Sequence, residues 1–405
     1  MSTPFPVKLL HVGIDFGEEE IPVGRLALSN WQIYFSYEAS FIERKLEISP
    51  LTLPLKSEIT TVEYDLFEGL PGVFNDSLPD GWGRLLADRS FSSNGISLAE
   101  VTPLDRLSLV GHRGLGALTY KPDYKLSFES KDVNLDDLAS SVEEVLEGQT
   151  QDVLAQLLAL NGSSAGARPK VIVGVSKDKQ QLTTGEGDES WLVKFPQSND
   201  GKDAGSIEYV YALMAKKAGI HMSDVHLFPA TQSPGYFGTQ RFDRVGTKRY
   251  HMHTASGLLH SDFRYPSLDY KTLLALTFHL TSDHREVVKM FRLAVFNVLA
   301  HNRDDHAKNF SFLMDSDGLW RLSPAYDLTF SSGPRGEQSM MVMGEGKNPT
   351  TENLIELGVD GGVKKSEIKE IIDQTQGALG EWNTLAKEYG VSKQRQKAIS
   401  SLITP

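Results

Sequence analysis

The stretch Asn302-Arg303-Asp304-Asp305-His306-Ala307-Lys308-Asn309, followed eighteen residues later by Asp327 in Pro324-Ala325-Tyr326-Asp327, decides the fold of this 405-residue chain. Its spacing gives an aspartate, an asparagine five residues on, and then a second aspartate. Between them, residues 309–314 (NFSFLM) predict a strand, 315–318 (DSDG) a turn closed by glycine, and 319–322 a returning strand. Asp304 and Asp327 are therefore expected near the two ends of one β-hairpin.

The segment before this stretch predicts an amphipathic helix over residues 284–301. Its apolar side chains recur with the i, i+3, i+4, i+7 spacing of one helix face. They are Val287, Val288, Phe291, Ala294, Val295, Val298 and Leu299. Asp304 follows directly after the end of this helix, at the start of the loop that leads into the hairpin.

The order of these parts matches the phosphoryl-transfer site of a protein kinase. There a carboxylate orients and deprotonates a hydroxyl nucleophile, while amide and carboxylate oxygens hold Mg²⁺ against the nucleotide phosphates. The aspartate-to-asparagine spacing alone occurs about once by chance in a chain of this length, so its surroundings must support it. The alternative interpretation is a surface hairpin with solvated carboxylates.

Two charged residues upstream fit the same site. Lys194 interrupts the apolar run 191–195 (WLVKF), where a strand lysine can bind nucleotide phosphates. Glu208 follows fourteen residues later in a predicted helix that should end at Gly219, after basic residues in its last turn. The apolar face of that helix is Ile207, Val210, Tyr211 and Met214. We expect Glu208 to hold Lys194 by an ion pair; the alternatives are an edge-strand lysine and a solvated helix face.

Residues 162–170 (GSSAGARPK) lie between an apolar helical segment, 153–160, and a predicted strand, 171–175. Small residues let backbone N–H groups approach phosphates closely. The stretch matches neither of the common glycine-rich nucleotide motifs, so a plain connection between helix and strand is an equal alternative.

Taken together, these motifs resemble the HipA-type serine/threonine kinase toxins of bacterial toxin–antitoxin systems. The matching blocks, in order, are Phe74–Gly83 (FNDSLPDGWG), Arg106–Gly111 with Gly114–Leu118, Ser163–Lys170, Lys194–Pro196, Arg241–Arg244 (RFDR), Asp304–Ser311 and Pro324–Asp327. The resemblance implies an α+β, protein-kinase-like bilobal fold with an additional N-terminal mixed α/β subdomain. It places that subdomain at 1–125, a nucleotide-side lobe at 126–254, and a mainly helical C-terminal lobe with the catalytic loop at 255–405.

The resemblance also implies roles for individual residues, with ATP and Mg²⁺ as cofactors. Asp304 is the expected catalytic base, Asn309 and Asp327 the Mg²⁺ ligands, Lys194 the phosphate-binding lysine, and Ser163 an autophosphorylation site. The wider set expected around the nucleotide is Ser163, Ser164, Ala165, Gly166, Ala167, Lys170, Glu208, Arg241, Phe242, His306 and Lys308. Two departures stand out: Asp305 is expected to add negative charge beside the metal site, and His253-Thr254 to alter the adenine-side contacts.

The composition and net charge of the chain restrict what kind of protein it is and what kinds of partner it can bind. A hydrophobic content of 40% is ordinary for a soluble globular protein, and the absence of cysteine excludes disulfides and thiolate metal sites. No signal peptide or membrane span is expected, so the chain is predicted to be cytoplasmic. Its net charge of −12 argues against unaided DNA binding. The implied partners are a protein substrate, by analogy an aminoacyl-tRNA synthetase, and a helix-turn-helix antitoxin dimer that contacts DNA.

Three other functions remain open from the sequence. A metal-dependent hydrolase is suggested by His251-Met252-His253, His301, Asp304 to His306 and Asp327, although the repeated βα series of such barrels is missing. A catalytically idle kinase-like subunit of a repressor complex is the second. A small-molecule kinase of the aminoglycoside type is the third, but it leaves the Ser163 block unexplained.

Turn- and loop-forming residues along the chain predict where the remaining strands, helices and loops lie. Short strands are expected at Pro22–Ala27, Trp31–Tyr37 and Val62–Asp65, and mainly helical structure from Leu268 onward, apart from the hairpin. The segment 331–349 is rich in glycine, serine and methionine and is predicted to be a loop with little core of its own.

Overall fold

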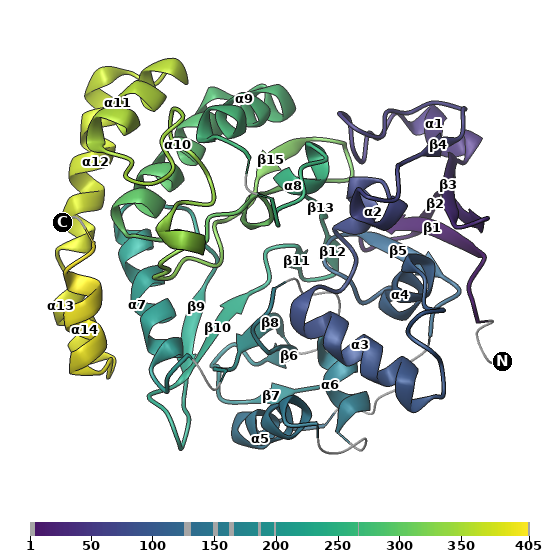
Figure 1. The fold of residues 1–405 in the computed structure, drawn as a ribbon, viewed down its shortest axis with the longest axis horizontal. Coiled ribbons are helices and arrows are strands. Elements are labelled where there is room, and N and C mark those ends of the chain that lie inside the picture. The colour runs from purple at the N-terminus through teal and green to yellow at the C-terminus, as the bar shows by residue number, and fades with distance from the viewer. Residues whose placement is uncertain are drawn as a thin grey trace.

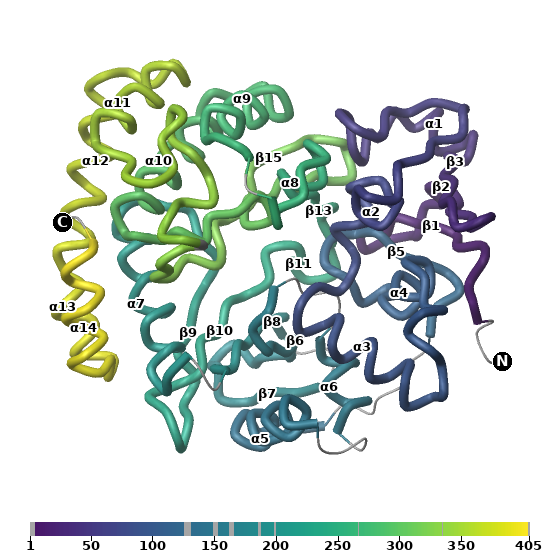
Figure 2. The backbone as a smooth tube through the Cα atoms, viewed as in Figure 1, coloured from purple at the N-terminus to yellow at the C-terminus, as the bar shows by residue number. Residues whose placement is uncertain are grey.

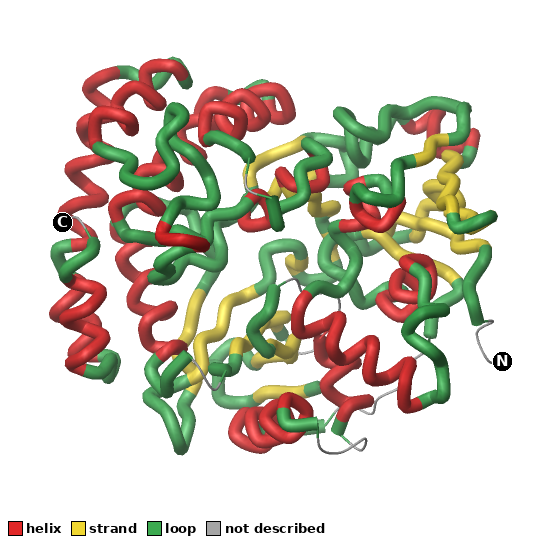
Figure 3. Tube along the Cα trace, viewed as in Figure 1, coloured by secondary structure: helices red, strands yellow, loops and turns green. Residues whose placement is uncertain are grey.

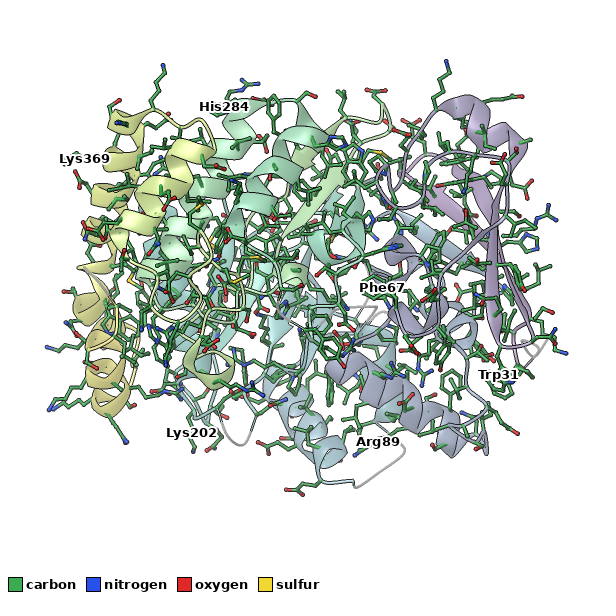
Figure 4. The ribbon with its side chains drawn as sticks, turned by 45° about the horizontal axis from the view of Figure 1, so that its top comes forward. Trp31, Phe67, Arg89, Lys202, His284 and Lys369 are labelled. Atoms are coloured by element: carbon green, nitrogen blue, oxygen red, sulfur yellow. The ribbon has the colours of Figure 1, made fainter. Side chains whose placement is uncertain are left out.

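The computed structural model describes residues 5–124, 131–148, 153–161, 166–184, 188–197, 200–265 and 267–403. The N-terminal strands lie at one end of the longest axis and the C-terminal helices at the other (Figures 1 and 2). Figure 4 shows Trp31 on the N-terminal sheet and Lys369 on the C-terminal helices at these opposite ends. The described residues form three hydrophobic cores.

The N-terminal part is built on an antiparallel five-stranded sheet in the order β4-β3-β2-β1-β5. Leu10, Val12 and Ile14 of β1 alternate inward to the core, the period-2 pattern of a half-buried strand. The elements are β1 Leu9–Asp15, β2 Glu20–Ser29, β3 Gln32–Tyr37, α1 Ala39–Arg44, β4 Thr60–Thr61, η1 Phe67–Gly69, α2 Gly72–Asn75, α3 Gly81–Ser93, α4 Pro103–Val110 and β5 Leu118–Lys121.

The strand expected at Val62–Asp65 is wrong, because β4 is Thr60–Thr61 and ends before that range. β4 pairs with Tyr34 and Phe35 and then leaves the sheet. The amide of Leu66 donates to the carbonyl of Glu63, which closes a turn where the strand was predicted. Apolar and polar residues alternate over 62–65, but the segment is an exposed turn and not part of a sheet: Tyr64 is 62% exposed.

The middle sheet has the order β7-β6-β8-β10-β9 and carries the strand lysines. Its elements are α5 Leu135–Leu146, α6 Leu154–Asn161, β6 Lys170–Val175, β7 Leu182–Thr183, β8 Glu189–Lys194, α7 Ala204–Lys217, β9 Val225–Phe228 and β10 Tyr236–Gln240. Val171, Val173 and Val193 face one core together with α6 and with Trp82 of α3. The N-terminal helix α3 therefore packs on the sheet that is expected to bind the nucleotide.

The C-terminal part is mainly helical, as predicted, and Figure 3 shows its helices gathered at one end of the molecule. Its elements are β11 Arg244–Val245, β12 Lys248–Arg249, β13 His251–Thr254, α8 Ala255–Leu258, α9 Tyr270–Thr281, α10 His284–Leu299, η2 Ala307–Asn309, β14 Ser311–Met314, β15 Trp320–Leu322, η3 Pro334–Gly336, α11 Thr351–Asp360, α12 Lys365–Leu379, α13 Trp382–Glu388 and α14 Lys393–Ser400. None of the helices in the described part of the chain is long and apolar enough to cross a membrane.

Helix α7 belongs to the middle of the sequence but packs in the helical core. Its predicted apolar face, Ile207, Val210, Tyr211 and Met214, is buried there. The Tyr211 hydroxyl donates to the carbonyl of Ala300, 2.7 Å away, at the end of α10. The helix that carries Glu208 is thus fixed to the helix that leads into the catalytic loop.

The segment 331–349 is a loop, but the prediction that it has little core of its own is wrong. Met340 and Val342 are 1% and 0% exposed and pack in the helical core. The amide of Met341 donates to the carbonyl of Leu268, and the amide of Tyr270 donates back to the carbonyl of Met341. Sequence composition missed these contacts because they join residues about seventy positions apart.

Candidate active site

The catalytic loop begins where α10 ends. The predicted helix is present, with Val287, Phe291, Ala294 and Leu299 buried. His301 then takes a left-handed backbone conformation (φ 54°). This conformation is uncommon for residues other than glycine and is often found at functional sites. The next residue, Asn302, is buried and donates to Asn297 of α10 over 2.9 Å. These contacts fix the base of the loop, from which Asp304 reaches a cavity of about 1190 Å³.

The predicted hairpin is confirmed as β14 and β15, which pair in antiparallel register. Beyond it, the Tyr326 hydroxyl donates to the carbonyl of Lys308 over 2.6 Å and ties the second aspartate to the catalytic loop. Asp327 has φ 58°, a left-handed conformation that aspartate and asparagine tolerate better than most residues. Asp304, Asn309 and Asp327 consequently line one cavity.

Lys194 joins the two sides of this cavity. Its ammonium group lies 2.5 Å from Glu208 Oε1 and 2.5 Å from Asp327 Oδ1. The expected Lys194–Glu208 ion pair is therefore present, and the side chains of Lys194 and Glu208 are only 10% and 5% exposed. A buried cation needs such partners, because an unpaired charge in the interior is costly.

The two aspartates have opposite electrostatic environments. Although Asp304 is exposed to the cavity, the cavity walls remove part of its hydration and, with the neighbouring Asp327 carboxylate, raise its pKa. Burial opposes the charge of Asp327, yet the ammonium groups of Lys194 and Lys170 outweigh it and lower the pKa of Asp327. Neighbouring carboxylates whose pKa values are pushed apart are typical of sites in which one acts as a base and the other stays ionised.

A second lysine stands directly opposite the first. Lys170 of β6 pairs with Lys194 of β8 in the sheet, and Lys170 is 4% exposed. Burial and the like charge of Lys194 lower the pKa of Lys170 to about 8. Arg168, which the sequence reasoning did not single out, also lines the cavity and contacts Asp200 at 3.2 Å. Together these cations make the cavity floor suited to an anionic ligand.

The remaining residues predicted to surround the nucleotide line the cavity, except for those outside the described part of the chain. Gly166 and Ala167 line the cavity, whereas Ser163, Ser164 and Ala165 lie outside the described residues. His306 and Lys308 also line the cavity. Arg241 and Phe242 line it as well, but the Arg241 guanidinium is engaged by Asp243 at 2.7 Å, while Phe242 packs on Tyr326.

The expectation that Asp305 adds charge beside the metal site is wrong. Its side chain is 1% exposed and points into the helical core. There the carboxylate accepts hydrogen bonds from the Tyr270 hydroxyl (2.7 Å), from Gln338 (3.0 Å) and from the amides of Ser339 and Met340. The alternation of the loop backbone sends Asp304 outward and its neighbour inward.

The pair His251 and His253 does not form the metal site of a hydrolase. Both rings are fully buried in β13. His251 Nε2 contacts the carbonyl of Ile48 at 2.8 Å, and His253 contacts Asp76 at 2.6 Å and Ser49 at 3.0 Å. Within the described ranges, no three His, Cys, Asp or Glu side chains gather as a metal site would require. These histidines fasten the N-terminal part to the C-terminal part.

Sequence reasoning missed the N-terminal contribution to the cavity. Asp76, Ser77, Asp80 and Gly81 line it, although they precede the kinase-like parts by more than eighty residues. They belong to the block Phe74–Gly83, whose charged and small residues were the available signal.

Comparisons with known proteins agree with this arrangement. Residues 162–382 match the HipA-like C-terminal domain, and residues 18–121 match the HipA N-terminal domain. The chain belongs to the HipA family. The two matches cover the residues that line the cavity and the N-terminal sheet apart from β1. The domain boundaries at 125 and 254 stay predictions.

The relatives found are distant in sequence, and a solved structure among the matches is similar in fold. The candidate kinase Y4dM of Sinorhizobium fredii is 25% identical over 76% of this chain and 74% of that protein. The candidate kinase Y4mE of the same organism is 33% identical over 26% of this chain and only 20% of its own length. The HipA protein in a complex with HipB and operator DNA from Shewanella oneidensis MR-1 has 15% identity, 96% and 94% coverage and a TM-score of 0.68. This likeness confirms the kinase-like α+β fold with an N-terminal sheet subdomain.

Proposed function

We propose that this HipA-family protein is an ATP-dependent serine/threonine protein kinase and the toxin of a toxin–antitoxin pair. One observation carries the proposal: Lys194 bridges Glu208 and Asp327 across a cavity into which Asp304 also projects. A strand lysine held by a helix glutamate, beside a base and a second aspartate, is the constellation that phosphoryl transfer from a nucleotide requires.

The residues present fit a nucleotide. Leu192, Met222, Phe237 and Leu328 give the cavity apolar walls suited to the adenine base, while Lys170, Lys194 and Arg168 supply positive charge for the phosphates. The ligands available to Mg²⁺ are the Asp327 carboxylate and the Asn309 amide oxygen. The amide nitrogen of Asn309 already donates to the carbonyl of Asp304 over 2.8 Å. One carboxylate and one amide suit a Mg²⁺ ion that completes its coordination with phosphates and water.

The protein groups then divide the chemistry between them. Bound Mg²⁺-ATP would supply the phosphoryl group and neutralise its developing charge. Asp304 accepts the proton of the attacking hydroxyl, and its raised pKa brings it closer to the range in which a base is effective. Lys194 would hold the phosphates of a bound nucleotide, and Glu208 keeps Lys194 charged and oriented. Arg168 and Lys170 add to the same anion site.

Three finer parts of the proposal rest on the family resemblance. Ser163 is proposed as the autophosphorylation site, where a phosphate would add about −1.5 to −2 charges to a loop that otherwise faces the triphosphate. The substrate is proposed to be a protein, with an aminoacyl-tRNA synthetase as the first candidate by analogy. The partner is proposed to be a HipB-like helix-turn-helix antitoxin, in keeping with the complex of the Shewanella structure.

Intact-mass spectrometry of the purified chain with and without Mg²⁺-ATP tests the proposal. A kinase that modifies itself should gain one phosphate, and fragmentation should place it on Ser163. A companion assay with radiolabelled ATP and a serine-rich acceptor such as casein detects transfer to another protein. If the wild-type chain binds ATP but transfers phosphate to neither acceptor, it is an idle subunit and the proposal fails.

A further inference from the structure

The turn Asp80-Gly81-Trp82, which we call the bridging turn, lies between the two halves of the cavity. It consists of the N-cap residue and the first two residues of α3, in the N-terminal part of the chain. Asp80 caps α3 by accepting a hydrogen bond from the amide of Gly81 over 2.8 Å. On one side the turn contacts the catalytic loop, and on the other it contacts Gly166 and Ala167 of the Ser163–Lys170 block. Neither contact is local in sequence.

Toward the catalytic loop, Asp80 contacts Lys308. Asp80 Oδ2 lies 3.3 Å from the ammonium group of Lys308, whose side chain is 8% exposed. The ammonium group also lies over the ring of Phe263, 4.8 Å from its centroid. A nearly buried cation with one close carboxylate depends on that carboxylate for its position, because leaving it unpaired is costly. Lys308 precedes Asn309, so its position affects the proposed metal ligand.

Toward the nucleotide lobe, the bridging turn contacts backbone. The amide of Trp82 donates to the carbonyl of Gly166 over 3.2 Å. A β-carbon on Gly81 would lie 2.6 Å from both the Cα of Ala167 and the carbonyl oxygen of Gly166. Real β-carbons do not approach backbone so closely, so this position has room for glycine alone unless the 166–167 backbone moves.

We propose that the bridging turn positions both halves of the active site: Asp80 holds Lys308 in the catalytic loop, and Gly81 with Trp82 holds Gly166 and Ala167 at the phosphate side of the cavity. The proposal rests on the proposed kinase function and deepens it. It makes the N-terminal subdomain a working part of the active site. Asp80 is here a positioning residue rather than a catalytic one.

The first test changes charge without changing the cap. Asn caps helices as well as Asp, so Asp80→Asn keeps the start of α3 and removes the ion pair with Lys308, together with a longer one, 3.8 Å, with the exposed Arg264. We expect kcat to fall about ten-fold or more, with KM for ATP within about three-fold of wild type. Asp283→Asn is the matched control, because Asp283 caps α10 and pairs with exposed Arg285 away from the cavity. It should leave kcat unchanged.

A double-mutant cycle separates this role from general stability. If Asp80 acts through Lys308, adding Asp80→Asn to Lys308→Met should cost little beyond Lys308→Met alone. Additive losses in kcat would overturn the positioning role. Thermal unfolding of each variant shows whether it is folded at the assay temperature.

The second test disturbs the contact between Gly81 and the backbone of residues 166–167. Gly81→Ala should raise the Kd for a fluorescent ATP analogue about ten-fold or more, because the 166–167 backbone must shift. Gly95→Ala is the matched control: Gly95 also has a positive φ (77°), but a β-carbon there meets nothing within 4 Å. Equal affinities for the two variants would overturn the contact with Gly166 and Ala167.

These measurements also distinguish the bridging turn from the kinase proposal. If wild type binds the analogue and transfers no phosphate, the kinase function fails. The Gly81→Ala and Gly95→Ala affinities still decide the nucleotide-side half, and the absence of any kcat overturns the Asp80 half. If wild type neither binds nor transfers, both proposals are overturned.

Discussion

At the scale of single residues, Asp304 and Asp327 differ in what surrounds them. Asp304 is exposed to the cavity, whereas Asp327 contacts Lys194 at 2.5 Å. We predict that Asp304→Asn lowers kcat by about two to four orders of magnitude, the usual loss on removing a positioned base, and leaves the Kd for Mg²⁺-ATP nearly unchanged. Asp327→Asn should weaken Mg²⁺-ATP binding as well, because it removes a proposed ligand and a partner of Lys194.

The Asp304→Asn and Asp327→Asn variants can be compared directly. Asn tolerates the left-handed backbone of position 327, so the variant should fold. Calorimetric titration with Mg²⁺-ATP and a single-turnover transfer assay measure the two effects separately. If the Asp304→Asn variant transferred phosphate at the wild-type rate, the Asp304 carboxylate would not be the base. Equal Mg²⁺-ATP affinity of both variants would remove Asp327 from the metal site.

At the scale of elements, Asp305 binds the segment 338–340 to the catalytic loop through three hydrogen bonds and binds Tyr270 of α9 through a fourth. Burial raises the pKa of Asp305 to about 7, against those hydrogen bonds, from an ordinary value of 3.8. The folded carboxyl therefore holds its proton more tightly than the unfolded one. Its stabilising contribution is complete below about pH 4 and is lost as the pH rises through about 7.

Asp305→Asn should expose this pH dependence. Because the amide does not titrate, we predict that wild type loses stability relative to the variant by about 1 kcal/mol per pH unit between about pH 5 and pH 7. Urea unfolding of both proteins across this range measures the difference and cancels the other titrating groups. Parallel curves would mean that Asp305 is ionised in the native state throughout, and the donors around it would then outweigh burial.

The elements that the sequence predicted well are those with local signals. The helix at 284–301, the hairpin after Asp304 and the face of α7 follow from apolar spacing and turn residues, so the Lys194–Glu208 pair could be expected from them. The inward direction of Asp305 and the burial of Met340 depend on contacts far apart in sequence, which periodicity does not contain. The same holds for Asp80, whose partner Lys308 lies 228 positions away.

At the scale of the whole molecule, a buried pair joins the N-terminal part to the C-terminal part. Asp76 accepts hydrogen bonds from His253 and from the amide and hydroxyl of Thr254, all within 2.7 Å. Asp76→Ala should lower the free energy of unfolding by about 3 kcal/mol, because it leaves buried donors unpaired. Asp123→Ala breaks an aspartate–histidine pair with the exposed His112 and a longer contact with Arg113 at 3.3 Å, and should cost about 1 kcal/mol. Equal losses in urea unfolding would show that Asp76 does not fasten the two parts.

The charge of the whole chain leads to the last prediction, which concerns its partner. At −12, the chain repels the phosphate backbone, so alone it should show no appreciable affinity for its own promoter DNA at physiological salt. With the proposed basic helix-turn-helix partner, a complex should form whose affinity falls with salt, mainly through the partner's Lys and Arg residues. Fluorescence anisotropy of labelled promoter DNA across a salt series measures both. Tight, sequence-specific binding by the isolated chain would contradict this division of labour. So would a salt slope for the complex much steeper than that of the partner alone, because the acidic chain would then be adding phosphate contacts of its own.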